Sequence, residues 1–286
     1  MEPTAHDEHA ATVENLPLTR LELTGVDDLK AHWNRVDVVT LPRTKTSPYT
    51  VGYASSDRCV EAALRLRYEV FNLELGEGFA AAVVTGLDRD AYDDQFTHIV
   101  LLEDDSSRVV GTYRIQAMSQ GLKALGVYAA QFFDLTDFAP FMPKTVELGR
   151  ACLAHDHRTL PAIINLWLGV GGFMNLFENN YVFGCCSLTS QDPDDGWRAL
   201  KTIRAQNHLH PTLALPAKPH CRCGDTVREH DPDIEPIRLP KLFRTYLRLG
   251  CQVISEPVID REFGTVDFLI FLNGREVNFS PLDFIK

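Results

Sequence analysis

The sequence predicts an α/β layer fold, in which a mixed β-sheet carries helices on both faces. Apolar runs of strand length alternate with segments of helical periodicity, in the order strand, helix, two strands, strand, helix, strand, helix and a late strand pair. Residues 60–75 repeat apolar side chains every three or four positions, as one face of a helix does. Residues 108–116 alternate from one position to the next, as a strand does. This order favours one sheet covered on both sides.

The first half of the chain predicts three strands and one long helix. After a short strand at 50–56, Asp57 can cap the helix, because its carboxylate accepts the free N–H groups of the first turn. The helix is expected to end at Gly76. Runs at 99–102 and 108–116 predict two strands joined by a turn rich in Asp and Ser. The expected buried stripe of the helix is Val60, Leu64, Tyr68, Phe71 and Leu75.

The second half predicts the remaining strands and helices of the sheet. A further short helix is expected at 128–133, and residues 208–236 lack a regular pattern. Gly250 closes the last helix. The expected strands are 145–153, 181–188, 252–259 and 265–272, and the expected helices are 161–178, 194–206 and 241–249.

The segment from Thr159 to Phe177 carries no charged residue and approaches the length of a membrane span. It also contains Pro161, two asparagines and three glycines. Its large apolar side chains fall on one stripe, which favours a helix packed on a protein core over a span. That stripe consists of Ile163, Trp167, Val170, Met174 and Phe177.

Charge and composition exclude several classes of protein. The 286 residues carry a formal net charge of -11, so nucleic acid is not an expected partner without a local basic patch. Seven cysteines, two of them adjacent, do not form a disulfide pattern and indicate a reducing cytoplasm. The N-terminus lacks the pattern of a secretory signal. We expect a mobile tail and arm over 1–45 and a single domain over 46–286.

Charged residues recur at positions that otherwise suit a core. Arg67 lies close to the apolar face of its helix, and Arg114 lies on a strand. Glu147 and Arg150 flank Gly149, where a bulge would turn both side chains to one face. With Asp93 or Asp94 these residues predict a cluster of arginines and acids. The cluster is either a functional site or a structural ion-pair network.

Cysteine and histidine residues offer two further candidate sites. Cys152, Cys185 and Cys186 lie in apolar strands with no base placed beside them, so a nucleophilic role is not favoured. The segment with His208, His210, His220, Cys221, Cys223 and His230 has the residue types of a zinc site. Its Cys-x-Cys spacing and several prolines favour a plain loop, and we predict no bound metal.

Short motifs along the chain resemble those of one enzyme family. They are LRYEVF at 66–71, DRDAYD at 88–93, VGTYR at 110–114, ELGR at 147–150, FGCCS at 183–187, LPKLFRTYLRLG at 239–250 and VIDREFGTVD at 258–267. Together they resemble the N-acyltransferases of the GNAT superfamily that use acyl carrier protein, in particular the ornithine lipid synthase, or hemolysin-like, type. The resemblance covers about residues 50–275. N-acyl amino acid synthases and acyl-homoserine lactone synthases share Arg67, Phe71, Asp93, Arg114, Glu147 and Arg150.

The resemblance implies a GNAT-like sheet that is mostly antiparallel and contains a splayed strand pair. It implies transfer of a fatty or 3-hydroxy-fatty acyl group to the α-amine of an amino acid, with ornithine favoured. Glu147 is the expected general base, acting directly or through a water, and the backbone amides of 151–153 are expected to donate to the oxyanion. The arginines would hold the acceptor carboxylate or brace the pocket. The implied catalytic residues are Glu147, Arg150 and Asp93, and the implied substrate-binding residues are Arg67, Phe71, Arg114, Cys152, Leu153, Arg158 and Trp167.

The turn at 158–162 departs from the superfamily and bears on the acyl donor. A typical GNAT member holds the pyrophosphate of coenzyme A on a glycine-rich turn, whereas the turn that resembles it here reads RTLPA. Pro161 has no N–H to donate, which favours a phosphopantetheine-linked donor on acyl carrier protein. We expect no permanently bound cofactor. The basic stripe Lys241, Arg244 and Arg248 is either a solvated helix face or a docking surface for the acidic carrier protein.

Other readings of the resemblance stay open. The chain can be another N-acyl amino acid synthase or an acyl-homoserine lactone synthase. A non-enzymatic lipid- or membrane-binding protein would use the same pocket, as the hemolysin-like label suggests. We expect a cytoplasmic protein, with peripheral contact at the inner membrane as an open alternative.

Overall fold

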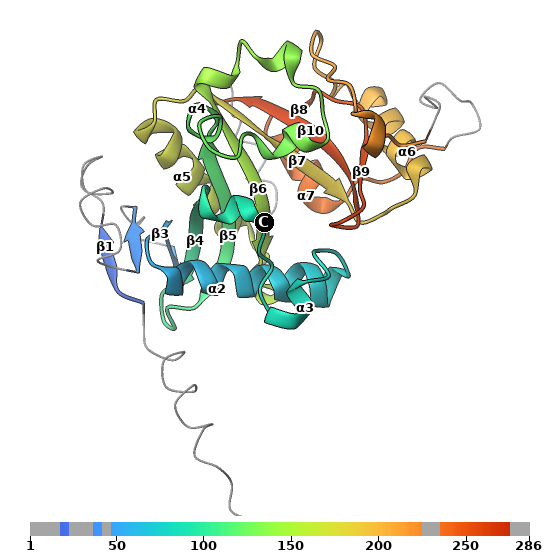
Figure 1. Ribbon diagram of the computed structural model, residues 1–286. Coiled ribbons are helices and arrows are strands. Elements are labelled where there is room, and N and C mark those ends of the chain that lie inside the picture. Colours follow the sequence, from blue (N-terminus) through green and yellow to red (C-terminus); the bar gives the residue numbers. More distant parts are fainter. Residues whose placement is uncertain (1–17, 23–36, 42–46, 225–234, 275–286) are drawn as a thin grey trace, which may run out of the picture.

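The computed structural model describes residues 18–22, 37–41, 47–224 and 235–274 and places one mixed sheet at the centre of the molecule (Figure 1). The strand order is β1-β2-β3-β4-β5-β6-β7-β10-β8, and β9 pairs with β10. The strands are β1 (Arg20–Glu22), β2 (Val38–Thr40), β3 (Tyr49–Ala54), β4 (Thr97–Glu103), β5 (Val109–Ala117), β6 (Thr145–Leu153), β7 (Tyr181–Leu188), β8 (Gln252–Val253), β9 (Val258–Asp260) and β10 (Thr265–Asn273).

The sheet is mostly antiparallel, as predicted. Each neighbouring pair from β2 to β6 is antiparallel, and β10 runs antiparallel to β7, β8 and β9. The β1–β2 and β6–β7 pairs are parallel. β1 and β2 lie before the predicted domain boundary at residue 46, so the sheet begins earlier than the sequence predicts. The predicted strand at 252–259 is also wrong, because the chain leaves the sheet between β8 and β9.

Helices cover both faces of the sheet, as predicted (Figure 1). α2 (Asp57–Tyr68) and α3 (Ala82–Thr85) lie on one face, where Leu66 of α2 belongs to the same buried cluster as Val100 and Leu102 of β4. α5 (Leu160–Leu176), α6 (Pro193–Ala205) and α7 (Lys241–Arg248) build the core on the opposite face. α4 (Met118–Gly121) follows β5. Short 3₁₀ segments span Ala91–Asp94 (η2), Tyr128–Gln131 (η3), Thr136–Phe138, Met142–Lys144, His155–His157 and Pro219–Cys221.

α2 continues without a break into a π-helix, η1 (Glu69–Leu75), which ends at Gly76 with a φ of 68°. The predicted cap is wrong, because Ser56 rather than Asp57 accepts the Cys59 N–H. The predicted stripe also fails at its end, where Leu75 is 40% exposed. A π-helical turn holds more residues than an α-helical one, so positions after Tyr68 rotate away from the α-helical stripe.

β6 and β7 form the predicted splayed pair. They are paired from Thr145↔Tyr181 to Leu148↔Gly184 and separate beyond this point. Below we call the space beyond Leu148 and Gly184 the splay. On its other edge β6 stays paired with β5, with a register shift between Thr112 and Arg114 of β5. This shift is the predicted bulge, although Arg150 rather than Gly149 takes the left-handed conformation, with a φ of 55°.

α5 confirms the predicted packed helix. Trp167, Val170 and Met174 are buried in the core, whereas Ile163 and Phe177 are only partly buried. Of the helices within the described residues, none combines the length and apolar character that crossing a bilayer requires.

Candidate active site

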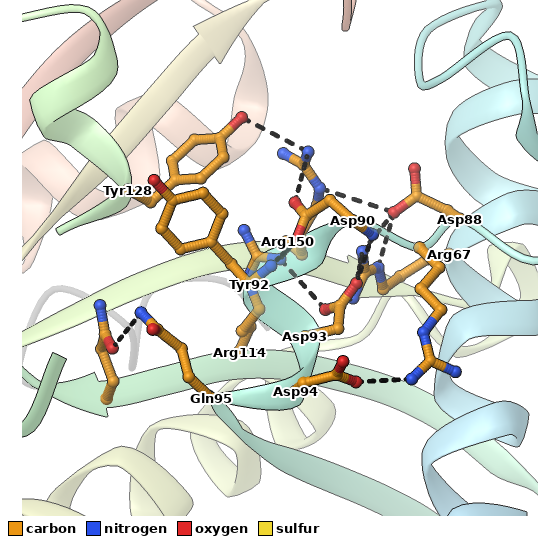
Figure 2. Close-up of polar contacts among 12 residues, drawn as sticks. Arg67, Asp88, Asp90, Tyr92, Asp93, Asp94, Gln95, Arg114, Tyr128 and Arg150 are labelled. Carbon is orange, nitrogen blue, oxygen red and sulfur yellow. Dashed lines mark hydrogen bonds and ion pairs between the residues drawn. The ribbon is translucent and has the colours of Figure 1, made fainter. Parts of the chain in front are cut away.

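Three arginines and three aspartates meet under α2, and we call them the ion cluster (Figure 2). Arg67 Nη1 donates to Asp93 Oδ1 at 2.6 Å, and its Nε donates to Asp88 at 2.7 Å. Arg114 Nη1 donates to Asp90 Oδ1 at 2.6 Å and to Asp93 Oδ1 at 3.0 Å. Arg150 completes the cluster, with its Nη2 3.4 Å from Asp90 and its Nε 3.5 Å from Asp88. Three positive charges thus oppose three negative ones.

Local structure at η2 fixes the acids of the ion cluster. Asp90 caps η2, and the Asp93 carboxylate in turn accepts a hydrogen bond from the Asp90 N–H. The sequence offered Asp93 or Asp94, and the structure places Asp93 in the ion cluster and Asp94 outside it, paired with Arg89. Asp88 and Asp90 were missed as site residues. Their Asp-x-Asp spacing ahead of a capping position is the signal that could have identified them.

The ion cluster is buried, and its arginines keep Asp93 ionised. Although burial alone would raise it, Arg67 and Arg114 hold the pKa of the Asp93 carboxyl well below its usual range. The side chains of Arg67 and Arg114 are 0% and 1% exposed. These two guanidiniums therefore leave no room for an acceptor carboxylate, which corrects one of their two predicted roles. They brace the site instead.

Arg150 faces the splay at the edge of the ion cluster. Its guanidinium lies 4.0 Å from the Phe263 ring centroid, 4.9 Å from that of Phe79 and 5.4 Å from that of Tyr128. Such cation–π contacts each contribute about 0.5–2 kcal/mol. The left-handed backbone at this position costs of order 1–2 kcal/mol. The aromatic cage and the two aspartates offset that cost and fix where the guanidinium points.

Glu147 lies on the same side of β6 as Arg150, as the bulge predicts, but its carboxylate is enclosed. Its Oε2 accepts hydrogen bonds from Gln116 Nε2 at 2.7 Å and the Tyr128 N–H at 3.0 Å. Its Oε1 accepts the Ala129 N–H at 2.9 Å. The residue is 2% exposed, and burial raises its pKa. The geometry does not support the predicted general base, because three protein donors occupy the carboxylate. Glu147 instead anchors η3 and thereby positions Tyr128.

The other predicted binding residues surround the splay at different depths. Phe71 packs edge-on against Phe263, with ring centroids 5.3 Å apart. Cys152 is buried beneath α2, and burial raises the pKa of its thiol to about 12, so it has no nucleophilic character at neutral pH. Trp167 contributes to a small pocket at the start of the splay. That pocket is lined by Tyr113, Leu148, Trp167, Val182, Phe183, Gly184, Cys185 and Ile270.

Leu153 and Arg158 lie at the far end of β6. Strand pairing alternates, and the Ala154 N–H donates to Val110 of β5, so the Leu153 N–H points to the side that β7 has left. Arg158 Nε donates to the Leu153 carbonyl at 3.2 Å. Its two terminal nitrogens form a bidentate pair with Glu74 of η1 at 2.5 and 2.6 Å. Both side chains are about one-third exposed, at 37% and 33%.

The cysteine and histidine residues of 208–224 are dispersed. The Cys221 thiol donates to the Phe132 carbonyl at 3.0 Å, and the Cys223 carbonyl accepts the Trp197 indole N–H at 2.7 Å. Within the described ranges, no group of three His, Cys, Asp or Glu side chains has the arrangement of a metal site. His230 lies outside the described residues.

The predicted docking stripe on α7 is only partly on the surface. Lys241 and Arg248 are exposed, whereas Arg244 is half-buried. The Nε atom of Arg244 is buried without a hydrogen-bond partner in the described part of the chain. Two of the three predicted docking residues are therefore accessible to a partner.

Comparison with known proteins agrees with this architecture. Residues 66–168 match the family model "Acetyltransferase (GNAT) domain", which spans the ion cluster and the start of α5. An L-ornithine N(alpha)-acyltransferase of Rhodobacter capsulatus is 28% identical over 80% of this chain and 92% of its own length. The enzyme of the same name from Brucella abortus is 28% identical over 78% of this chain and 83% of its own.

Among solved structures, the N-acyl amino acid synthase FeeM from uncultured soil microbes aligns with a TM-score of 0.47 and 14% identity. The alignment covers 81% of this chain and 95% of that one. The GNAT match and the relatives along most of the chain agree with the motifs in the sequence. The chain therefore carries a GNAT acetyltransferase domain at 66–168 and is similar over most of its length to L-ornithine N(alpha)-acyltransferases, which together support an acyltransferase.

Proposed function

We propose that the protein transfers a fatty or 3-hydroxy-fatty acyl group to the α-amine of an amino acid, with ornithine as the first acceptor to test. The observation that carries this proposal is the splay, bordered by Arg150 on one strand and by Cys185 on the other. The curated relatives support the acceptor, since two of them are named for ornithine acylation.

In the proposed reaction the acyl thioester lies in the splay and the amine approaches from the α2 face. The Leu153 N–H on the free edge of β6 is available to donate to the oxyanion that forms when the amine attacks. Glu147 holds the η3 backbone, and Tyr128 of η3 packs on the Arg150 guanidinium. Because each of these groups is fixed by buried contacts, little reorganisation is needed as charge develops.

We propose acyl carrier protein as the donor, with its acyl group on phosphopantetheine and with no permanently bound cofactor on this chain. The N-terminus of α5 supports this choice. The Thr159 side chain already accepts the Ala162 N–H, and Pro161 has no N–H to offer. A pyrophosphate would find few backbone donors here. The exposed Lys241 and Arg248 offer a cationic patch for an acidic carrier.

We place this reaction in the cytoplasm, with peripheral contact at the inner membrane where an acylated amino acid would be released. Exposed apolar side chains at the end of η1 and on α3 support such a contact. Leu73 is 66% exposed, Val83 is 66% exposed and Val84 is 89% exposed. Single exposed apolar residues are common, whereas several on adjoining segments indicate a contact surface.

The experiment combines the purified protein with acyl-ACP and each of several amino acids, and follows both the carrier thiol and the product mass. We expect thiol release that depends on ornithine and yields N-acylornithine. Thiol release with a different amino acid would reassign the acceptor. The absence of transfer from acyl-ACP and from acyl-CoA to every amine would refute the acyltransferase proposal.

A further inference from the structure

A second group of buried acids lies beside the splay and outside the ion cluster. Glu77, Asp260 and Asp267 are 8%, 4% and 4% exposed. None of the three was predicted as a site residue, although Asp260 and Asp267 fall in the motif at 258–267. We call them the acid triad.

Strand register places Asp267 next to the splay. Asp267 of β10 is opposite Ser187 of β7, and its neighbours Val266 and Phe268 point into the core on the face that carries α6 and α7. Asp267 therefore points to the opposite face, the one that carries α2. Cys185, which borders the splay, shares that face with Ser187.

Aromatic residues from separate segments close this side of the splay. Phe263 packs on Phe79 with ring centroids 5.6 Å apart, and its carbonyl accepts the Gly78 N–H at 2.8 Å. Tyr128 donates a hydrogen bond to Asp260 Oδ2 at 3.4 Å. The Arg150 guanidinium stacks on Phe263. The acids are thus enclosed by side chains that also surround the reaction centre of the proposed function.

The acid triad lacks a matching positive charge. No ion pair formed within the described residues reaches Glu77, Asp260 or Asp267. Arg150 is the guanidinium that faces them, and it already borders Asp88 and Asp90 of the ion cluster.

The three acids differ in how their oxygens are used. Asp260 Oδ1 accepts the Glu262 and Phe263 N–H groups, so this carboxylate holds a turn. Asp267 Oδ1 is buried and accepts no hydrogen bond from the residues described. A buried carboxylate oxygen without a partner is costly, which indicates that a donor from outside the chain completes the site.

We propose that Asp267 is the general base that removes a proton from the ammonium group of the acceptor amino acid. This inference rests on the proposed function. An amino acid arrives with a protonated amine, which cannot attack a thioester until a proton is lost. Asp267 Oδ1 is an unused acceptor beside the splay, whereas the Glu147 oxygens are occupied by three protein donors.

The proposed transfer moves two protons from the ammonium group and exchanges a C–S bond for a C–N bond. The ammonium gives one proton to Asp267, and the neutral amine attacks the thioester carbon to form a C–N bond. The nitrogen of the resulting intermediate still carries one proton too many. The C–S bond then breaks, and that second proton goes to the sulfur, so amide and carrier thiol are released. Asp267 returns its proton to water before the next turnover.

The groups around Asp267 suit it to this task. Burial, and to a smaller extent the negative charge of Asp260, raises the pKa of Asp267 to about 6. The Ser187 and Thr265 hydroxyl groups and the positive charge of Arg150 partly lower this pKa. A base is most effective when its pKa lies near the working pH. Asp267 must be ionised to accept the proton, so kcat/KM is expected to rise with pH through about 6 and then level off.

The test compares wild-type protein with Asp267→Asn, using acyl-ACP and ornithine. We expect kcat to fall by about 10²–10⁴-fold, the range for a lost base, with the pH dependence near 6 abolished. The melting temperature should hardly change, because Asn keeps the size of Asp and, unlike the Glu147 oxygens, Asp267 Oδ1 holds no donor among the described residues. Asp137→Asn, at an exposed position, is the matched control and should retain wild-type kinetics.

A second acceptor separates loss of the base from damage to the site. Hydroxylamine is largely neutral at pH 7 and needs no deprotonation, so the Asp267→Asn protein should acylate it as fast as wild type does. Wild-type kinetics with ornithine would overturn the proposal, as would equal loss with both acceptors. If wild-type protein acylates no amino acid at all, the proposed function fails and the base assignment fails with it, a result distinct from either outcome.

Discussion

Replacing Glu147 by Gln distinguishes a positioning residue from a catalytic base. The carboxylate accepts three N–H groups, and an amide has one oxygen to offer them. If that oxygen faces Gln116 and Tyr128, the new NH₂ group meets the Ala129 N–H, and two buried donors lack acceptors. Loss of a charge-assisted hydrogen bond costs about 1.5–3 kcal/mol, and an unsatisfied buried donor costs about 1–3 kcal/mol.

Removing a buried charge offsets part of this cost. We therefore expect Glu147→Gln to lower the free energy of unfolding by about 2–4 kcal/mol. At about 2–4 °C per kcal/mol for a chain of this size class, the melting temperature falls by roughly 5–15 °C. Thermal unfolding of the purified variant measures this directly. Glu178→Gln, whose side chain is 87% exposed, is the control and should melt like wild type.

The opposite pattern would refute the reasoning. A Glu147→Gln protein with the wild-type melting temperature and a turnover lower by about 10²–10⁴-fold would restore Glu147 as the general base. A destabilised variant whose remaining folded fraction turns over substrate within a few-fold of wild type would fit an anchor of η3.

Three further predictions concern pH, the donor and its carrier. Burial lowers the pKa of His98 from 6.5 to about 4, so between these pH values the unfolded chain binds a proton at this residue and the folded chain does not. The free energy of unfolding should therefore fall by about 2 kcal/mol between pH 7 and pH 5. Urea unfolding of His98→Gln should show no such decrease. Glu74→Ala should free Arg158 for the donor phosphate and lower the donor KM by a few-fold, as an exposed pair is worth about 0.2–1 kcal/mol, whereas a raised KM would contradict this. Reversing Lys241 and Arg248 to Glu should reduce kcat/KM for acyl-ACP at low salt and spare acyl-CoA, and equal effects on both donors would exclude this docking surface.

Sequence periodicity predicted the individual elements well where local signals mark both ends. β6 and β7 have the predicted bounds, and Gly76 and Gly250 close their helices with φ values of 68° and 100°. Local patterns cannot give the change from α- to π-helix after Tyr68, because both helices suit the same residues. The insertion of β10 between β7 and β8 is also non-local, so periodicity did not reveal it.

The sequence predicted which arginines form the site better than it predicted what each of them does there. Sequence placed Arg67, Arg114 and Arg150 together, as the structure confirms, because each charge interrupts an apolar pattern. Whether a buried arginine meets substrate or protein depends on its partners. The partners Asp88 and Asp90 come from a polar segment without periodicity. Asp267 likewise needed the register of β10 against β7 before its position beside the splay was visible.

The position of β10 in the sheet has a consequence for how the chain folds. β7 ends at Leu188 and β10 begins at Thr265, so during synthesis one edge of β7 emerges long before its partner. That strand, YVFGCCSL, is uncharged and free of proline, which are features of aggregation-prone segments. Its pairing with β10 also closes a long loop, which slows folding. Chains halted before Thr265 should therefore associate through this edge, and chaperone demand during synthesis should be greatest in that interval.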